Sequence, residues 1–242
     1  QNSPDLTGNA TMQPDRQINL RRQSIYLLPN LFTLAALFAG FYAVVQSMNG
    51  RFEHAAVAIF AAVILDGLDG RVARLTHTQS AFGAEFDSLS DMVSFGVAPA
   101  LVAYEWALKD FGKFGWIVAF IYCAGAALRL ARFNTNLGTV DKRWFQGLPS
   151  PAAASLVAGL VWISLEHAEE LQPIAPALPW LTLFATLFGG LTMVSNVRYW
   201  SFKEFNRRRT VPFLALLAVV FLISLLAAKP WLVLFGFFVC YA

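Results

Sequence analysis

The sequence predicts an all-α integral membrane protein with about eight transmembrane helices. Of its 242 residues, 57% are hydrophobic and only 14% are charged, whereas soluble domains carry about 25% charged residues. Apolar runs of helical length, separated by short polar stretches, follow one another along the chain. At about 20 residues per span they use most of the sequence, which leaves no room for a second folded domain.

The first 24 residues are polar and lack the apolar segment of a signal peptide, so we expect residues 1–24 to form a tail. Each later apolar run is compatible with a helix. These runs are residues 25–48, 55–65, 92–108, 114–131, 151–165, 173–195, 211–228 and 230–242.

The cations predict the orientation of these helices. If successive loops alternate between the two sides, all 18 Lys and Arg residues fall on one side except Arg51, Lys109, Lys113 and Lys229. Cytoplasmic loops are enriched in Lys and Arg. Both termini are therefore expected in the cytoplasm and the 166–172 loop outside. This topology also accounts for the net charge of +3 without a nucleic-acid partner.

One acidic stretch falls where a membrane helix is expected. The apolar run 55–65 is only about 16 Å long as a helix, whereas a hydrocarbon core is about 30 Å thick. The helix must therefore continue through Asp66 and Asp69. Charged residues inside membrane helices are costly, so such a cluster is a candidate functional site.

Helical periodicity gathers the acidic residues on facing sides of two helices. Asp87 and Asp91 lie four residues apart on the second helix, with Gly83 one turn earlier. One face of the first helix contains Asp66, Asp69, Gly70, Ala73 and Arg74. A turn near residues 76–81 would bring the two carboxylate pairs to similar depth. Four carboxylates this close repel one another unless a cation neutralises them.

Aspartate oxygens favour hard divalent ions, Mg²⁺ or Mn²⁺. Two such ions could clamp a diphosphate while one aspartate accepts a proton from an attacking hydroxyl. Gly70 and Ala73 would leave space for a phosphate-bearing ligand beside the carboxylates. A purely structural ion-pair network of the first helix with Arg71 and Arg74 is the alternative, but it gives Asp87 and Asp91 no partners.

Written as spacing, the acidic segment is D-x2-D-G-x2-A-R-x8-G-x3-D-x3-D. It resembles the signature of the CDP-alcohol phosphotransferase family at all eight fixed positions. The resemblance implies a membrane enzyme that transfers a phosphoalcohol group from a CDP-linked donor to an alcohol and releases CMP. It also implies that Asp66, Asp69 and Asp87 are metal ligands, and that Asp91 is the general base with a further metal contact.

The resemblance also suggests how the chain is divided and how it assembles. A six-helix core typical of the family would span residues 25–195. Residues 196–242 would add a basic loop and two further transmembrane helices. A homodimer embedded in membrane lipid is the assembly that the family implies.

Four further segments are similar to the family members that use L-serine as the acceptor and CDP-diacylglycerol as the donor. These are PNLFT at 29–33, FDSLSDMVSFGVAP at 86–99, RLARFN at 129–134 and FQGLPSP at 145–151. The expected products are phosphatidylserine and CMP.

Two groups of binding residues are expected, one for the donor and one for serine. Those expected to bind CDP-diacylglycerol are Asn30, Thr33, Gly70, Ala73, Arg74 and Gly83. The negatively charged carboxylate of serine requires a positively charged partner. Arginine suits this role, because its guanidinium binds a carboxylate through two hydrogen bonds. The candidates are Arg132 with Asn134, and then Lys142 and Arg143. A role in setting the membrane orientation of the chain, or in contacting anionic lipid, would also explain the presence of these cations.

Two other functions are compatible with parts of the sequence. Another acceptor, such as glycerol 3-phosphate or inositol phosphate, would keep the whole donor site. An ion-coupled transporter could also use membrane aspartates, but such proteins often consist of two related halves. No second acidic motif occurs after residue 120, which argues against a transporter.

Overall fold

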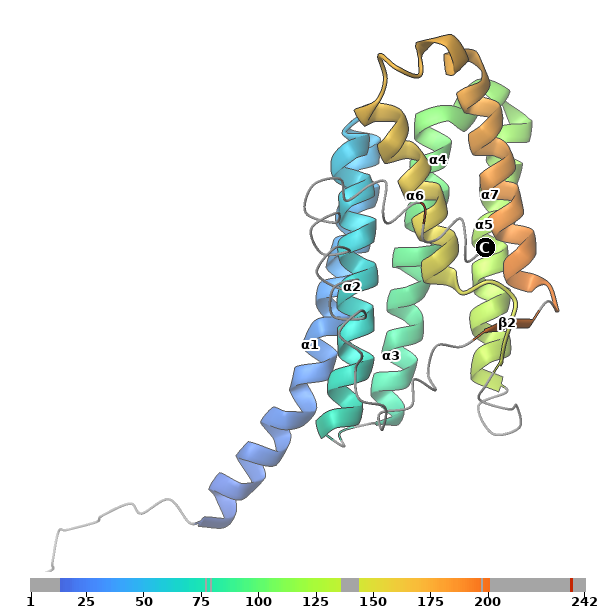
Figure 1. The fold of residues 1–242 in the computed structure, drawn as a ribbon. Coiled ribbons are helices and arrows are strands. Elements are labelled where there is room, and N and C mark those ends of the chain that lie inside the picture. Colours follow the sequence, from blue (N-terminus) through green and yellow to red (C-terminus); the bar gives the residue numbers. More distant parts are fainter. Residues whose placement is uncertain are drawn as a thin grey trace, which may run out of the picture.

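The computed structural model describes residues 14–76, 78, 80–135, 144–196, 198–200 and 236, with only the backbone for 14–28, 144–146 and 198–200. Within these ranges the chain forms an elongated bundle of helices that run side by side (Figure 1). The elements in chain order are α1 (Pro14–Met48), α2 (Phe52–Thr76), α3 (Ala81–Asp91), the π-helix η1 (Met92–Val97), α4 (Ala98–Ala103), the π-helix η2 (Tyr104–Leu108), the 3₁₀-helix η3 (Lys109–Phe111), α5 (Lys113–Thr135), β1 (Trp144–Gln146), α6 (Ser150–Glu166), the 3₁₀-helix η4 (Gln172–Ala177), α7 (Leu178–Val194) and β2 (Arg198–Trp200).

The architecture of apolar membrane helices expected from the sequence is confirmed. Within the described part of the chain, four helical stretches are long and apolar enough to cross a membrane: Pro29–Met48, Ala81–Phe111, Lys113–Thr135 and Gln172–Val194. The helix α6 is a shorter apolar helix. The expected helices at 211–228 and 230–242 lie outside the described residues, so a total of eight stays a prediction.

The first two helices form a long antiparallel pair (Figure 1). The turn between them contains Gly50, whose positive φ of 72° suits glycine. The helix α1 begins at Pro14, well inside the segment 1–24 expected to be a tail. Proline is favoured in the first turn of a helix, where its missing N–H needs no partner. As the short apolar run predicts, α2 continues through the acidic segment to Thr76.

The third helical stretch is a single rod from Ala81 to Phe111 that contains two π-helical turns. It begins earlier than the apolar run at residue 92 because the Ser80 side chain caps it. The Ser80 Oγ accepts a hydrogen bond from the Gly83 N–H at 3.0 Å. The π-helix η1 follows directly after Asp91.

A small two-stranded antiparallel sheet departs from the all-α expectation. The strands β1 and β2 pair with Phe145 opposite Tyr199. Both strands are three-residue segments rich in aromatic residues, which favour extended structure. The pairing joins the chain before α6 to the chain after α7.

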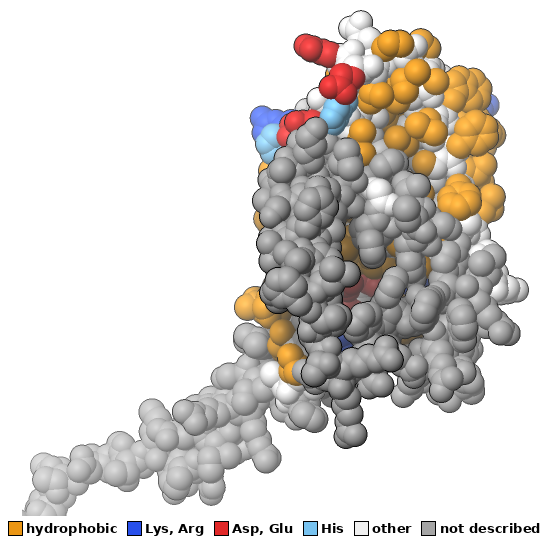
Figure 2. Space-filling model, in the orientation of Figure 1, with side chains coloured by type: hydrophobic (Ala, Val, Ile, Leu, Met, Phe, Trp, Pro, Cys, Tyr) orange, Lys and Arg blue, Asp and Glu red, His pale blue; other side chains and the backbone are white. Residues whose placement is uncertain are grey.

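Small residues allow the helices to pack closely. One buried cluster, formed by α1, α2, α4, α6 and η1, is dominated by alanines around Ile59 and Phe95. Membrane helices associate mainly through such close contacts. Large apolar side chains such as Phe120 and Phe184 are exposed. Figure 2 shows hydrophobic side chains gathered where α5 and α7 lie, as expected of a surface in contact with lipid.

Candidate active site and metal centre

Three aspartates from two helices converge near one end of the bundle. Oxygen atoms of Asp66 and Asp69 on α2 and of Asp87 on α3 all lie within 4.8 Å of one another. Asp69 is only 5% exposed. The two helices therefore face each other through their carboxylates, as the spacing of the motif predicts.

The fourth carboxylate, Asp91, completes two pairs across the interface between α2 and α3. Asp91 lies beside Asp66, and Asp87 lies beside Asp69, close enough for the carboxylates of each pair to interact electrostatically. Two carboxylates in contact repel unless a proton or a cation lies between them. The arrangement therefore requires positive charge at its centre.

The geometry of the cluster fits a divalent metal ion. The Oδ1 atom of Asp87 is buried and has no hydrogen-bond partner, and such an orphaned acceptor is costly unless something binds it. The donors are all carboxylate oxygens, which suits a hard divalent cation better than zinc or copper. Among the described residues, the group Asp66, Asp69 and Asp87 is the one able to hold a metal.

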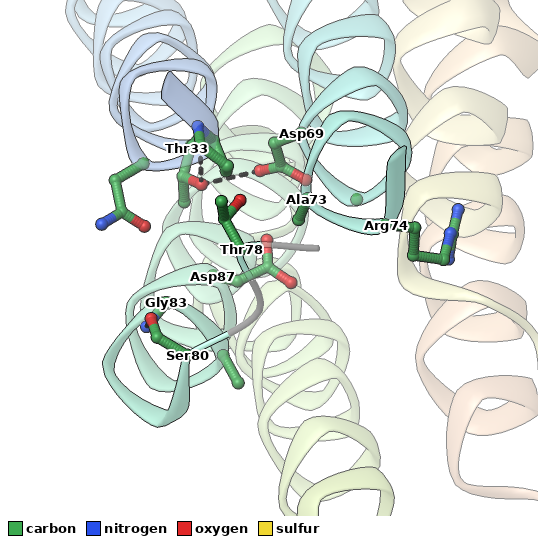
Figure 3. A pocket seen from close by; sticks show the side chains of 12 residues that line it. Thr33, Asp69, Ala73, Arg74, Thr78, Ser80, Gly83 and Asp87 are labelled. Atoms are coloured by element: carbon green, nitrogen blue, oxygen red, sulfur yellow. Dashed lines mark hydrogen bonds between the residues drawn. The ribbon is translucent and has the colours of Figure 1, made fainter. Parts of the chain in front are cut away.

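Thr33 on α1 joins this cluster from a third helix. Its Oγ1 donates a hydrogen bond to Asp69 Oδ2 at 2.8 Å and lies 3.2 Å from the Pro29 carbonyl oxygen (Figure 3). A hydroxyl has one proton, and the shorter contact is the one to Asp69. Thr33 therefore fixes the orientation of a candidate metal ligand.

A cavity of about 260 Å³ opens beside the carboxylates and is enclosed by α1, α2, α3 and the turn between α2 and α3. All six residues expected to bind the nucleotide donor line it, together with Asp69 and Asp87. The backbone of Gly70 borders open space, since an added Cβ would meet nothing within 4 Å. Figure 3 shows Arg74 turned away from Asp69 and Asp87, at the side of the cavity.

The residues expected to bind serine are only partly brought to this site. The Nδ2 of Asn134 donates to the Oγ of Ser88, the residue that follows Asp87 on α3, at 3.0 Å. Arg132 instead points toward the end of α7, where its Nη1 donates to the Asn196 Oδ1 at 3.2 Å. Lys142 and Arg143 lie outside the described residues.

Sequence reasoning overlooked Arg129, which lies one turn before Arg132 on α5. Its guanidinium interacts electrostatically with both Asp66 and Asp91, and its Nη1 donates to the Ser150 Oγ at 2.7 Å. The sequence feature that could have identified Arg129 is its position deeper in the membrane helix than Arg132. Of two arginines one turn apart, the one further inside an apolar helix is the costlier and therefore the better functional candidate.

Comparison with known proteins assigns the chain to a family. Residues 26–188, more than half of the chain, match the family model described as CDP-alcohol phosphatidyltransferase. The chain belongs to the CDP-alcohol phosphatidyltransferase family. This is a family of membrane enzymes that depend on divalent metal, which agrees with the aspartate cluster.

Relatives from distant organisms share this CDP-alcohol phosphatidyltransferase region. The chain is 41% identical over 214 residues to a CDP-diacylglycerol–serine O-phosphatidyltransferase of Helicobacter pylori, which covers 87% of this chain and 88% of the relative. Proteins of the same name match from Mycobacterium bovis (40% over 154 residues, 62% of this chain and 54% of the relative) and Saccharomyces cerevisiae (35% over 149 residues, 56% and 53%).

Proposed function

We propose that this chain transfers the phosphatidyl group of CDP-diacylglycerol to the hydroxyl of L-serine, forming phosphatidylserine and releasing CMP. The observation that carries the proposal is the cluster of Asp66, Asp69 and Asp87, with Asp91 next to it, beside a cavity lined by the remaining signature residues. The names of the family relatives, all serine-using transferases, support serine as the acceptor.

The donor's cytidine diphosphate would occupy the cavity between α1, α2 and α3. Asn30 and Thr33 would hold it from α1, while Gly70, Ala73 and Arg74 would border it from α2 and Gly83 from α3. The open space beside Gly70 supports this role. The position of the cavity at a membrane helix interface would let the acyl chains stay in lipid.

Asp66, Asp69 and Asp87 would hold divalent ions, with Asp91 as a further ligand, and we expect two ions of Mg²⁺ or Mn²⁺. When bound, such ions neutralise the diphosphate and stabilise the charge that develops on the departing CMP. The unpartnered oxygen of Asp87 supports this assignment.

Asp91 would act as the general base that takes the proton from the serine hydroxyl. The hydroxyl oxygen would then form a bond to the phosphorus that bears diacylglycerol, and the bond from that phosphorus to CMP would break. Arg129 interacts with both Asp66 and Asp91, which supports it as the cation that orients the serine carboxylate. Asn134 would contribute from the same helix, and the contacts of Arg132 with the end of α7 favour a supporting role.

We also propose that both termini are cytoplasmic, that the catalytic site opens to the cytoplasm, and that the enzyme is a homodimer. The distribution of cations in the sequence supports the orientation. The six-helix core would lie within residues 25–195, which agrees in extent with the matched family region.

The experiment that tests the function is CMP release by the purified protein in detergent with CDP-diacylglycerol and Mn²⁺ or Mg²⁺. The acceptors compared are L-serine, glycerol 3-phosphate, inositol phosphate and none, with the Asp91→Asn variant as the control. We expect release with serine alone and none from the variant. Release with another acceptor instead would keep the donor site and reject serine.

A further inference from the structure

Two buried serines join α1 to the helical rod that carries Asp87 and Asp91. The Ser90 Oγ donates to the Thr33 carbonyl oxygen at 3.1 Å, and the Ser94 Oγ donates to the Ala36 carbonyl oxygen at 3.0 Å. Ser90 is 2% exposed and Ser94 is fully buried. The two bonds lie one turn apart on both helices, so they form consecutive links across one interface.

The helices are close enough for these bonds because Gly40 has no side chain. A Cβ added at Gly40 would lie 2.6 Å from the Ser94 Cα atom, closer than real side chains approach. The contact between α1 and the π-helix η1 is therefore set by backbone approach. The hydroxyl of Ser94 fixes the position of α1 along the rod at this contact.

The first of these links is directly connected to the carboxylate site. Ser90 immediately precedes Asp91, and the residue whose carbonyl it holds, Thr33, donates its own hydroxyl to Asp69 at 2.8 Å. Two hydrogen bonds that share Thr33 on α1 therefore connect the Ser90 side chain, next to Asp91, with a carboxylate on α2. Together they join all three helices that enclose the cavity.

We infer that Ser90 and Ser94 are positioning residues, whose hydroxyls hold α1 against the rod and thereby set Thr33 and Asp69 relative to Asp87 and Asp91. The inference rests on the proposed function in that these aspartates bind metal. Neither serine lines the cavity, so Ser90 acts through Thr33, and Ser94 acts through the Ala36 carbonyl one turn further along α1. Partners outside the ligand shell orient metal ligands, and changing them alters metal affinity.

The test measures Mn²⁺ binding to the full chain in detergent by calorimetry, without substrates, together with thermal unfolding. We expect Ser90→Ala to weaken Mn²⁺ binding about 10-fold, the lower end of the range for outer-shell changes, and Ser94→Ala about threefold because it lies one turn further away. The matched control is Ser164→Ala. Ser164 is also buried, at 5% exposed, but its Oγ donates within its own helix to the Leu160 carbonyl oxygen at 2.7 Å.

A merely structural role predicts a different pattern. It would lower the unfolding temperature of all three variants and leave Mn²⁺ affinity, measured well below that temperature, equal to that of the parent. That result would overturn the inference. If Ser90→Ala does not fold, Ser94→Ala carries the test, and Mn²⁺ affinity in Ser94→Ala equal to that of the parent would overturn the inference in the same way.

The kinetic readout separates the inference from the proposed function. Ser90→Ala should raise the Mn²⁺ concentration that gives half-maximal CMP release while leaving the KM for serine unchanged. A parent protein that binds no Mn²⁺ would reject the metal site itself, and with it the proposed function. A parent that binds Mn²⁺ with the same affinity as Ser90→Ala would reject only the positioning role.

Discussion

Replacing Thr33 with valine removes the hydroxyl that donates a hydrogen bond to the carboxylate site. Thr33 is 3% exposed, and its Oγ1 donates to Asp69 Oδ2 at 2.8 Å. Valine has nearly the same shape but no hydroxyl, so Asp69 loses the partner that fixes its orientation. A hydrogen bond to a charged group contributes about 1.5–3 kcal/mol, which corresponds to a change of about 10- to 100-fold in an equilibrium constant. Loss of an outer-shell partner typically weakens metal binding over the same range.

We therefore expect Thr33→Val to weaken Mn²⁺ binding by about 10- to 100-fold. The assay is calorimetric titration of the detergent-purified protein with Mn²⁺, repeated as the Mn²⁺ dependence of CMP release. The matched control, Thr33→Ser, keeps the hydroxyl and should stay within about threefold of the parent, as expected when the outer-shell partner is preserved. The reasoning would be refuted if valine and serine gave the same Mn²⁺ affinity.

Three further predictions concern the proposed chemistry. Asp91→Asn should abolish CMP release while the calorimetric Mn²⁺ titration still shows binding, and release at the parental rate would reject Asp91 as the base. Arg129→Gln should raise the KM for serine by about 10- to 100-fold, the cost of losing a charge-assisted hydrogen bond, with the KM for CDP-diacylglycerol unchanged. Arg132→Gln, measured in parallel, should change the KM for serine less than Arg129→Gln does. A larger effect of Arg132→Gln would indicate Arg132 as the serine ligand. Gly70→Ala should not lower the unfolding temperature, because its Cβ meets nothing within 4 Å and alanine favours the helix, yet it should raise the KM for CDP-diacylglycerol by filling the cavity. An unchanged KM would remove Gly70 from the donor site.

The sequence predicts the carboxylate site well because simple constraints determine it. A run too short to span the membrane required α2 to continue through Asp66 and Asp69. The spacing of Asp87 and Asp91 then determined which side of the next helix faces them. Both inferences use only the helical repeat and the thickness of the bilayer.

The direction of Arg129, the start of α3 and the pairing of β1 with β2 could not be predicted, because the helical repeat of the sequence does not determine side-chain conformations or local turns. Arg129 and Arg132 are one turn apart on α5, and the repeat alone cannot tell which guanidinium turns toward the aspartates and which toward Asn196. The start of α3 depends on a cap at Ser80 that lies outside any apolar run. The pairing of β1 with β2 joins segments far apart in the chain, and local sequence patterns do not report such contacts.

The π-helical turn after Asp91 separates the part of the rod that carries the carboxylates from the part that packs into the core. In a regular α-helix, the direction of every side chain is fixed by that of its neighbours, so the half that carries the carboxylates would dictate which face the other half packs into the core. A π turn is wider than an α turn and shifts this angular phase. The acidic half can therefore face α2 while Phe95 and Val102 beyond it are fully buried. Helical-wheel comparisons among relatives should restart their count after residue 97, because a single wheel drawn through the whole rod would assign the wrong residues to the core.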